Sequence, residues 1–449
     1  MVLQRNEPVK IWGFAAAGEQ VTVSFSGQTK STVTNSSGKW EVILASLKTA
    51  AVGQDMLIKG SNTIKLTDIL VGEVWLCSGQ SNMEYQMRKL VKIPVPKNPT
   101  LGFPKNEVEN ADNKNIRIFL VNRKTLAKPD SLHKSWSLAE DSALRAFSVV
   151  GYFFAKEVQT KLGIPIGIIS SAVSGSAIEP WIAEEAFANE PYFSDKKVGN
   201  DPGKFYTSMI EPLKDFKLRG FLWYQGETNC FLDEKISYAY KMKTLINLWR
   251  NAWANSDMPF YLVQIAPYNY SKAKGEKVLN ENTQPEFWEA QAQQLRLANT
   301  GLVITTDLND NGEDLHPTYK WEVGRRLALW ALNNTYKHKS TFSGPIFKSA
   351  NFTKDKTVVT FDHADAGLKS IDGKPLTGFS VAGKDGKYVA ADAVIVGKKV
   401  VVSAPAVKEP TAVRFNWTEA PTSNFYGATG LPAMPFRSDN PLNKEFNIN

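Results

Sequence analysis

The chain has 449 residues, of which 43% are hydrophobic and 22% charged, as in a soluble globular protein too long for one hydrophobic core. The net charge is +8, but the 53 lysines and arginines are scattered, which favours a solvated basic surface over a nucleic-acid-binding one. No stretch approaches the roughly 18 uninterrupted apolar residues of a membrane span. We therefore expect two or three domains, no nucleic-acid partner and no membrane span.

The two cysteines, Cys77 and Cys230, exclude whole classes of site. Neither lies in a CxxC pair, so a zinc site built from thiolates and a disulfide framework are both excluded. Cys77 ends an apolar run and is interpreted as a core thiol. We expect no metal and no other cofactor.

Residues 1–68 alternate apolar and polar side chains, as half-buried strands do. Val21, Val23 and Phe25 share one face, and the turn at 36–38 separates them from the next alternating run, 40–44. No segment has helical periodicity over the length of a helix. This pattern predicts an N-terminal β-rich domain.

Residues 69–338 have a different hydrophobic pattern, with short apolar runs typical of strands buried on both faces of a parallel sheet. Helical patterns lie between these runs and predict an α/β sheet with helices on both faces. In such sheets ligands bind beyond the carboxyl ends of the strands. The predicted strands are 74–77, 118–121, 166–169, 221–224, 260–265 and 302–305, and the predicted helices are 149–162, 236–253, 288–298 and 320–332.

Residues 339–449 return to alternation, with strand-like runs at 357–361, 393–396 and 399–402 separated by glycine-containing turns. A second β-rich region is expected there.

Ser81 is the candidate nucleophile. It follows the apolar run 74–77 and a bend at Gly79, and it precedes residues 82–87, which have a helical pattern. A hydroxyl at a helix start faces free backbone N–H groups that can stabilise an oxyanion. The alternative is a serine that only caps a helix.

His316 is the candidate general base, because a serine hydroxyl needs one to become nucleophilic. Among four histidines, His133, His338 and His363 lie outside the strand ends of the α/β region. An acidic partner would fix the imidazole tautomer. Asp314 and Glu313 both qualify by position.

Two further segments follow predicted strands and can complete an oxyanion hole. One is residues 174–176, where Gly175 lets a backbone N–H approach a substrate closely. The other is residues 223–229, where Gln225 or Asn229 supplies a side-chain amide. A tight turn and ordinary loop capping are the alternatives for these two segments. A second carboxylate matching Glu227 is not evident, which disfavours a retaining glycosidase.

These motifs together resemble the sialate O-acetylesterase family of carbohydrate esterases, within the SGNH (GDSL-like) hydrolase superfamily. SGQSNM at 78–83 is the most specific match, and the matches span nearly the whole chain. The matching stretches are VLQR at 2–5, GEVWLCSGQSNME at 72–84, PIGIISSAVSGSAIEPW at 165–181, GFLWYQGETN at 220–229, DLHPTYKWEVGRRLALWAL at 314–332 and GLPAMPFR at 430–437.

The resemblance implies a flavodoxin-like α/β/α catalytic domain at 69–338, flanked by β-sandwich-like regions at 1–68 and 339–449. It places the nucleophile on Ser81 and the general base on His316. Oxyanion donors are then the Ser81 and Gly175 amides and the Gln225 side chain. Four neighbouring residues are predicted to contact the substrate: Gln80, Asn82, Ser176 and Glu227.

Two departures from the family pattern affect these assignments. Members commonly have Gly-Gly-Thr where this chain has Ser-Gly-Ser at 174–176. The wider superfamily places its acid three residues before the histidine, at Glu313, whereas the family more often has an aspartate two before, at Asp314. Asp314 is the favoured partner.

The resemblance further implies a secreted or periplasmic protein whose leader has been removed, since the chain starts at the VLQR segment. The predicted function is a metal-independent serine esterase that removes O-acetyl groups from carbohydrates, most specifically O-acetylated sialic acids. The alternatives are an esterase of acetylated xylan or other plant polysaccharides, and a non-catalytic carbohydrate-binding protein on a hydrolase scaffold. The preferred sugar, the position of the ester and the oligomeric state are left open.

Overall fold

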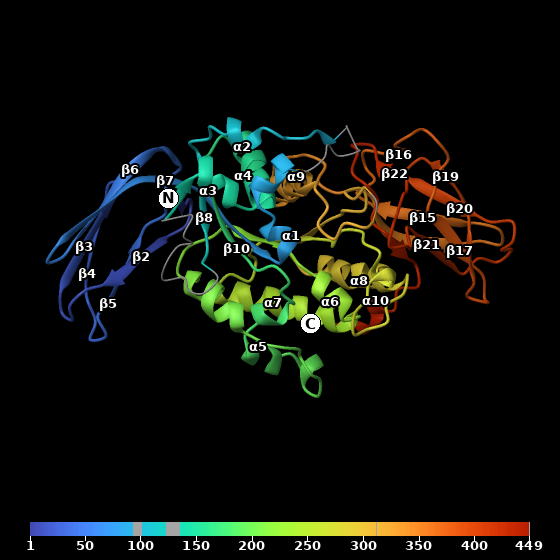
Figure 1. The fold of residues 1–449 in the computed structure, drawn as a ribbon, viewed down its shortest axis with the longest axis horizontal. Coiled ribbons are helices and arrows are strands. Elements are labelled where there is room, and N and C mark those ends of the chain that lie inside the picture. Colours follow the sequence, from blue (N-terminus) through green and yellow to red (C-terminus); the bar gives the residue numbers. More distant parts are fainter. Residues whose placement is uncertain (93–100, 123–134, 311, 449) are drawn as a thin grey trace.

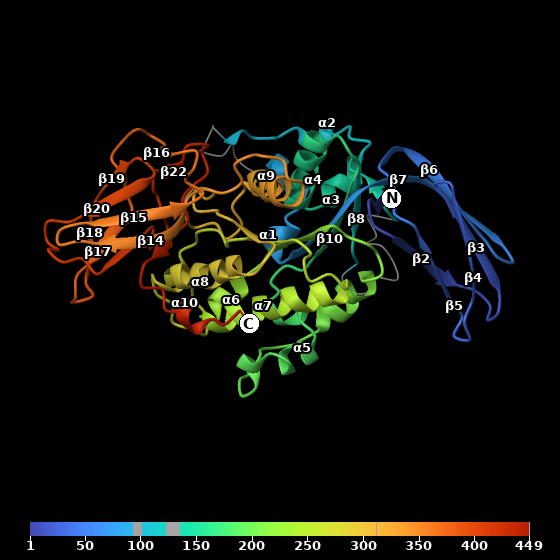
Figure 2. The same cartoon turned by 180° about the vertical axis from the view of Figure 1, so that it is seen from behind.

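The computed structural model describes residues 1–92, 101–122, 135–310 and 312–448, so that His133 lies outside the described residues. Three parts lie in a row, with an N-terminal β region and a C-terminal β region on opposite sides of a central α/β region (Figure 1). The same arrangement is seen from behind in Figure 2.

The N-terminal region has the strands that alternation predicts. Val21, Val23 and Phe25 are all buried, at 2%, 0% and 2% exposure. One sheet joins β4, β3, β6 and β7, with β1 added in parallel to β7, and β2 pairs with β5 in a second sheet. The strands are β1 (Val2–Gln4), β2 (Val9–Phe14), β3 (Gln20–Phe25), β4 (Gln28–Val33), β5 (Lys39–Leu44), β6 (Ala50–Lys59) and β7 (Thr63–Gly79).

The central sheet has the order β13-β12-β11-β7-β10-β8-β9. All its neighbours pair in parallel except β8 and β9, which pair antiparallel. Each of the six predicted strands is present. The further strands are β8 (Ile116–Leu120), β9 (Ser137–Leu138), β10 (Ile166–Ala172), β11 (Gly220–Tyr224), β12 (Phe260–Val263) and β13 (Thr300–Val303).

Helices cover both faces of this sheet, because successive side chains of a strand point to opposite faces. Val74 and Leu76 of β7 pack in the core on the α7 and α8 side, whereas Trp75 and Cys77 pack in the core against α4 and α9 (Figures 1 and 2). The helices are α1 (Ser81–Glu84), α2 (Glu107–Asn110), α3 (Asp141–Ala146), α4 (Val149–Leu162), α5 (Glu184–Ala188), α6 (Glu227–Phe231), α7 (Ile236–Ala252), α8 (Thr283–Ala292) and α9 (Lys320–Trp330).

The predicted helices agree with the structure to different degrees. The α4 helix has the predicted bounds, and α7 and α9 end within two residues of theirs. The helix predicted at 288–298 begins five residues earlier as α8 and gives way to a 3-10 turn at Gln293–Arg296. The sequence pattern missed this start because residues 283–287 include Pro285, which a helix accepts in its first turn.

The predicted boundary at 68/69 falls inside one uninterrupted strand. β7 runs for 17 residues, pairs with β6 and β1 near its start and then enters the central sheet between β10 and β11. The N-terminal region and the central region therefore share backbone hydrogen bonds rather than a linker.

The C-terminal region contains two four-stranded antiparallel sheets, β14-β15-β20-β19 and β18-β17-β21-β23, and a pair β16-β22, around one apolar core. Its elements are β14 (Ile346–Phe352), β15 (Thr357–Asp362), β16 (Leu368–Ser370), β17 (Phe379–Ala382), β18 (Tyr388–Ala390), β19 (Asp392–Val396), β20 (Lys399–Ser403), β21 (Ala412–Phe415), β22 (Phe425–Gly427), β23 (Phe436–Arg437) and α10 (Leu442–Glu445).

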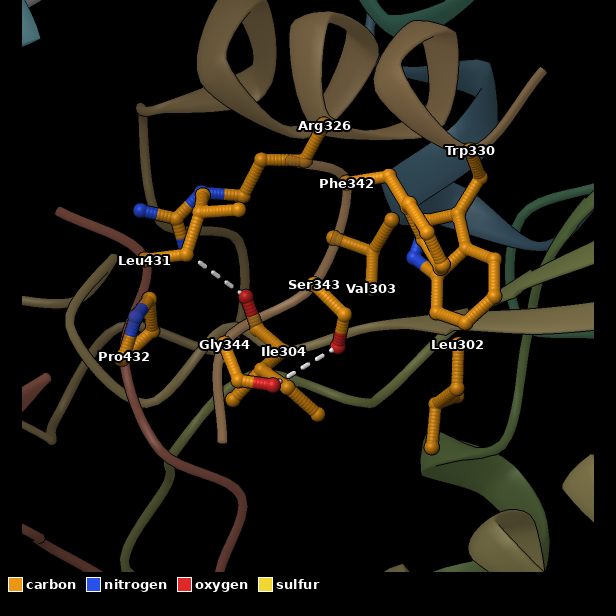
Figure 3. Close-up of a pocket in the computed structure, with 10 residues that line it drawn as sticks. All are labelled: Leu302, Val303, Ile304, Arg326, Trp330, Phe342, Ser343, Gly344, Leu431 and Pro432. Atoms are coloured by element: carbon orange, nitrogen blue, oxygen red, sulfur yellow. Dashed lines mark hydrogen bonds between the residues drawn. The ribbon is translucent and has the colours of Figure 1, made fainter. Parts of the chain in front are cut away.

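The last residues leave this region and pack on the central one. Leu442 and Phe446 join the core beneath the central sheet, and Tyr240 of α7 donates its hydroxyl to the carbonyl of Glu445. Where the C-terminal region meets β13 and α9, ten residues line a cavity of only about 10 Å³ (Figure 3). A space of that size holds one water at most, so the chain is closely packed around these ten residues.

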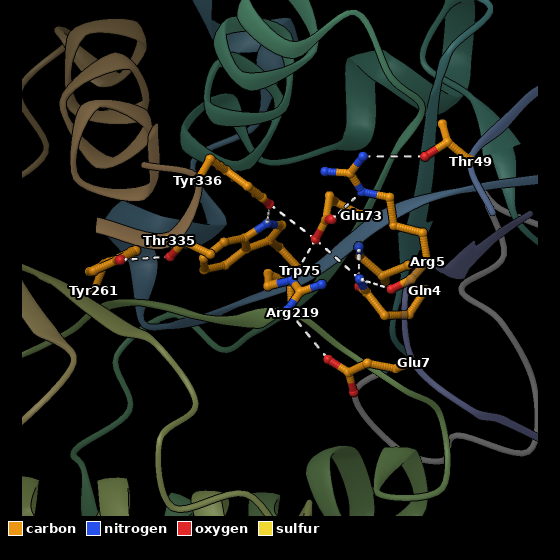
Figure 4. A network of polar contacts seen from close by, with 11 residues as sticks. Gln4, Arg5, Glu7, Thr49, Glu73, Trp75, Arg219, Tyr261, Thr335 and Tyr336 are labelled. Atoms are coloured by element: carbon orange, nitrogen blue, oxygen red, sulfur yellow. Dashed lines mark hydrogen bonds and ion pairs between the residues drawn. The ribbon is translucent and has the colours of Figure 1, made fainter. Parts of the chain in front are cut away.

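Glu73 of β7 ties the N-terminal strand to the central region (Figure 4). Its carboxylate is 1% exposed and accepts from Arg5 Nε and Arg219 Nε, each at 2.6 Å. Gln4 Nε2 and the Tyr336 hydroxyl donate to the same carboxylate, at 3.1 and 3.2 Å. One buried anion thus receives hydrogen bonds from four separate side chains.

We expect Glu73→Ala to lower the free energy of unfolding by about 3 kcal/mol, because it leaves two guanidinium groups without their carboxylate. Glu109→Ala is the matched control, since its ion pair with Arg145 is 44% exposed on both sides and is worth less than about 1 kcal/mol. Denaturant unfolding measures the free energy of unfolding of both variants. A loss below about 1 kcal/mol for Glu73→Ala would contradict the stabilising role given to Glu73.

Candidate active site

Ser81 lies at the carboxyl end of β7, between the ends of β10 and β11. Gly79 has φ +140°, and a Cβ on it would lie 2.1 Å from the Tyr224 carbonyl oxygen, so only glycine fits this close approach. The Gln80 N–H donates to that same carbonyl at 3.0 Å. The local backbone therefore holds Ser81 at the sheet edge.

The helix expected after Ser81 is shorter than its pattern indicates. α1 is one turn of four residues, because Gln86 forms a β-bridge with Ser148 and the Met87 N–H donates to the Phe147 carbonyl. A single turn has a weak dipole, so backbone N–H groups at its start matter more than the helix as a whole.

His316 meets Ser81 directly. The imidazole Nε2 lies 2.8 Å from Ser81 Oγ, and both residues are partly exposed. These residues are 235 positions apart in the chain. A hydroxyl and an imidazole at this distance can exchange a proton.

The surroundings of His316 favour its neutral form. Partial burial lowers its pKa below the usual 6.5, the positive charges of Lys320 and Lys89 lower it further, and the carboxylate of Asp314 raises it. Near neutral pH the imidazole is therefore unprotonated and able to accept a proton.

Asp314 contacts the backbone of His316. Its Oδ1 accepts the His316 N–H at 2.8 Å, and the side chains of Asp314 and Glu313 are both exposed. This contact of Asp314 with the histidine is therefore through the backbone. The choice of Asp314 as the acid partner stays a prediction.

The turn that carries Gly175 is held against α1, the helical turn that begins at Ser81. Gly175 has φ +74° and is exposed. Beside it, Ser174 donates both its backbone N–H, at 2.7 Å, and its hydroxyl to the carboxylate of Glu84 in α1. Thr228 Oγ1 donates to the Gly175 carbonyl at 3.2 Å. The Gly175 N–H thus has a fixed position relative to Ser81.

Gln225 and Asn229 hydrogen-bond within the loops that surround Ser81. The Gln225 side chain is fully buried, and its Nε2 donates to the Ser176 carbonyl at 3.2 Å and to Asn229 Oδ1 at 2.7 Å. Asn229 is equally buried and donates to Glu179 at 3.1 Å. Both amides therefore support the loops around the site in this structure, and the part of Gln225 as an oxyanion donor stays a prediction.

The four residues expected to contact the substrate are also buried, at 7% exposure or less. Gln80 Oε1 accepts from the Gly226 N–H at 3.2 Å, and Ser176 Oγ accepts from Trp181 Nε1 at 3.1 Å. Asn82 donates to Glu227. These side chains hold parts of the site together, and their contact with the substrate stays a prediction.

Among the described residues, no group of three or more His, Cys, Asp or Glu side chains is arranged to hold a metal ion. No helix in those same ranges is long and apolar enough to cross a bilayer. Cys77 and Cys230 are free and buried, and burial raises the pKa of Cys77 to about 12, as expected for a core thiol.

Comparison with known proteins identifies the family. The model of the family described as carbohydrate esterase, sialic acid-specific acetylesterase matches residues 71–333, more than half of the chain. This chain belongs to that family. It is 26% identical to sialate O-acetylesterase of Rattus norvegicus, covering 97% of this chain and 92% of the rat protein, and 26% identical to that of Homo sapiens, covering 97% and 90%.

A solved structure agrees with this assignment over the full length. The crystal structure of a carbohydrate acetylesterase from Xanthomonas citri is 32% identical, covers 98% of this chain and 97% of its own, and superposes with a TM-score of 0.85. The β regions on both sides of the central sheet are therefore part of the shared architecture.

Two residues of this carbohydrate esterase site were missed by the sequence interpretation. Glu84 clamps the Gly175 turn, and Lys320 lies buried beside His316. The signal for Lys320 was a lysine four residues after the histidine, at the start of an otherwise buried helix. Glu84 gave no signal, because its partner Ser174 is 90 residues away.

We expect a fluorophosphonate probe to label Ser81 at a rate that falls as the pH drops through the pKa of His316. Protonation removes the acceptor, so the midpoint should lie below 6.5. Mass spectrometry of the labelled peptide measures the rate at each pH.

Two controls belong to this labelling experiment. Ser81→Ala should abolish labelling, and His363→Gln should keep the wild-type midpoint, because His363 packs against Trp330 and Phe342. A pH-independent rate, or a midpoint above 6.5, would contradict the part given to His316.

Proposed function

We propose that this protein is a serine esterase that removes O-acetyl groups from carbohydrates, with O-acetylated sialic acids as the preferred class. One observation carries the proposal: Ser81 Oγ lies 2.8 Å from His316 Nε2 in a member of a carbohydrate esterase family. The curated relatives over nearly the whole chain are sialate O-acetylesterases.

The proposal includes a flavodoxin-like fold of the SGNH hydrolase type for the central region. Setting aside β8, which pairs on the outer side of β10, the parallel strands β7, β10, β11, β12 and β13 lie in the spatial order 2-1-3-4-5. Flavodoxin-like sheets have this order and bind ligands where it reverses. Ser81 follows β7, the strand at that reversal.

The reaction uses the serine and histidine in two steps. Ser81 Oγ attacks the acetyl carbonyl carbon while His316 Nε2 takes the hydroxyl proton. The bond from that carbon to the sugar oxygen then breaks, and His316 returns the proton to the departing sugar hydroxyl. Water attacks the acetyl group on Ser81 in the same way, which releases acetate and restores the serine.

The oxyanion of each step is assigned to the backbone N–H groups of Ser81 and Gly175. The support for Gly175 is its exposed turn, held by Glu84 and Thr228. Gln225 acts behind this pair, because its amide holds the Ser176 carbonyl of the same turn. Such fixed donors stabilise the developing charge without reorganising during the reaction.

We expect Ser81→Ala and His316→Ala each to lower kcat for an aryl acetate by at least roughly a thousandfold, with folding unchanged. Acetate release from O-acetylated sialic acids, acetyl xylan and acetylated simple sugars then ranks the substrates. Fastest release from acetyl xylan would replace the sialate preference with the polysaccharide alternative. Near-wild-type rates in either variant would end the proposal of a serine esterase and favour a binding protein.

A matched pair of substitutions tests whether Asp314 or Glu313 is the acid partner of His316. Asp314→Asn removes the charge that raises the pKa of His316 and weakens the acceptor of its N–H, so kcat should fall about tenfold or more. Glu313→Gln should stay within about twofold of wild type. Steady-state kinetics on an aryl acetate measure kcat for both variants. A larger loss of kcat in Glu313→Gln than in Asp314→Asn would assign the acid partner to Glu313.

A further inference from the structure

The backbone around His316 is held on both sides by buried side chains. Asn82 Nδ2 donates to the carbonyl of Leu315 at 3.0 Å, and Lys320 Nζ donates to the carbonyl of Pro317. These carbonyls belong to the residues directly before and directly after the histidine. With the His316 N–H on Asp314, the two peptide units that flank His316, 315–316 and 317–318, have fixed partners.

The carboxylate of Glu227 acts on both of these side chains, Asn82 and Lys320. Asn82 is fully buried and also donates to Glu227 Oε1, and Glu227 and Lys320 are each 1% exposed. Glu227 and Asp314 both act electrostatically on Lys320. A buried cation is costly without a compensating anion, and Asp314, followed by Glu227, raises the pKa of Lys320 against the lowering effect of burial. Burial also raises the pKa of Glu227.

Lys320 lies at the start of α9 against two aromatic rings. Its Nζ is 5.3 Å from the ring centre of Tyr85 and 5.8 Å from that of Tyr224. Burial lowers its pKa to about 7, so it is charged at the lower pH where His316 takes up a proton. Its charge therefore acts on the partly buried imidazole with much less screening by water and salt than a surface charge has.

We propose that Lys320, buried near Asp314 and Glu227, is a positioning residue that, together with Asn82 of α1, keeps the His316 imidazole aimed at Ser81 and unprotonated. This inference rests on the proposed esterase function and adds a second layer to its site. A lysine that only anchors the start of α9 would leave the titration of His316 unchanged.

The charges that face His316 come from three elements. Lys320 belongs to α9, Asp314 to the loop of the histidine itself, and Lys89 to the 3-10 helix Met87–Lys92. Lys89 is exposed, and its Nζ lies 4.6 Å from the ring centre of Tyr85. It is the natural control, because its charge acts through solvent.

The test compares Lys320→Met with Lys89→Met by two readouts. The first is the acid limb of kcat/KM for an aryl acetate. The second is the NMR titration of the imidazole protons, which is practicable because the chain has four histidines and His316→Gln identifies the signal. The NMR titration does not require activity. If the wild type has no esterase activity, the proposed function is wrong, and the titration still tests the role of Lys320.

Lys320→Met should move both midpoints upward by roughly one pH unit, because it removes a nearby positive charge. It should also lower kcat by about tenfold or more with little change in KM, since the histidine loses a backbone anchor. The upward shift should persist at about 1 M salt, where the Debye length is about 3 Å. Lys89→Met should give a smaller shift that disappears at this salt concentration.

A second variant protects the test from misfolding. Lys320→Met combined with Glu227→Gln leaves neither charge unpaired, and it should show the same upward shift. Folded variants with wild-type midpoints and wild-type kcat would overturn the inference. Failure of both variants to fold would also overturn it, because the pair would then serve the fold rather than the histidine.

Discussion

The hydrogen bond between Ser81 and His316 depends on where strand β7 ends. β7 lies between β10 and β11, and glycine at position 79 lets the chain pass within contact distance of the Tyr224 carbonyl. The serine emerges there, and the histidine reaches it from a loop beyond β13. Every other group of the site is arranged around that meeting point, including Glu84, the Gly175 turn and the buried lysine.

Much of this arrangement was predictable from local pattern. Apolar runs such as 74–77 and 166–169 mark strands buried on both faces, and the parallel sheet then brings their carboxyl ends to one edge. Ser81 and His316 follow two such ends, so the topology places both at one edge of the sheet. Helix α4 was equally clear, because Ser148 caps its start and Gly163 ends it in the left-handed conformation.

The side-chain partners were not predictable, because they depend on distances across the fold. Gln225 follows a strand and carries an amide, which made it a reasonable oxyanion donor, yet tertiary packing places that amide against Ser176 and Asn229. Asn82 and Glu227 were close to the site in sequence and lie beneath it in space. A pattern can locate a residue at a sheet edge, but burial decides whether its polar group faces outward.

The uninterrupted course of β7 has a consequence for how the molecule can change over evolution and in the laboratory. A fusion of two different proteins at about residue 68 would interrupt β7 where β1 and β6 both pair with it. The N-terminal β region is therefore not an exchangeable cassette.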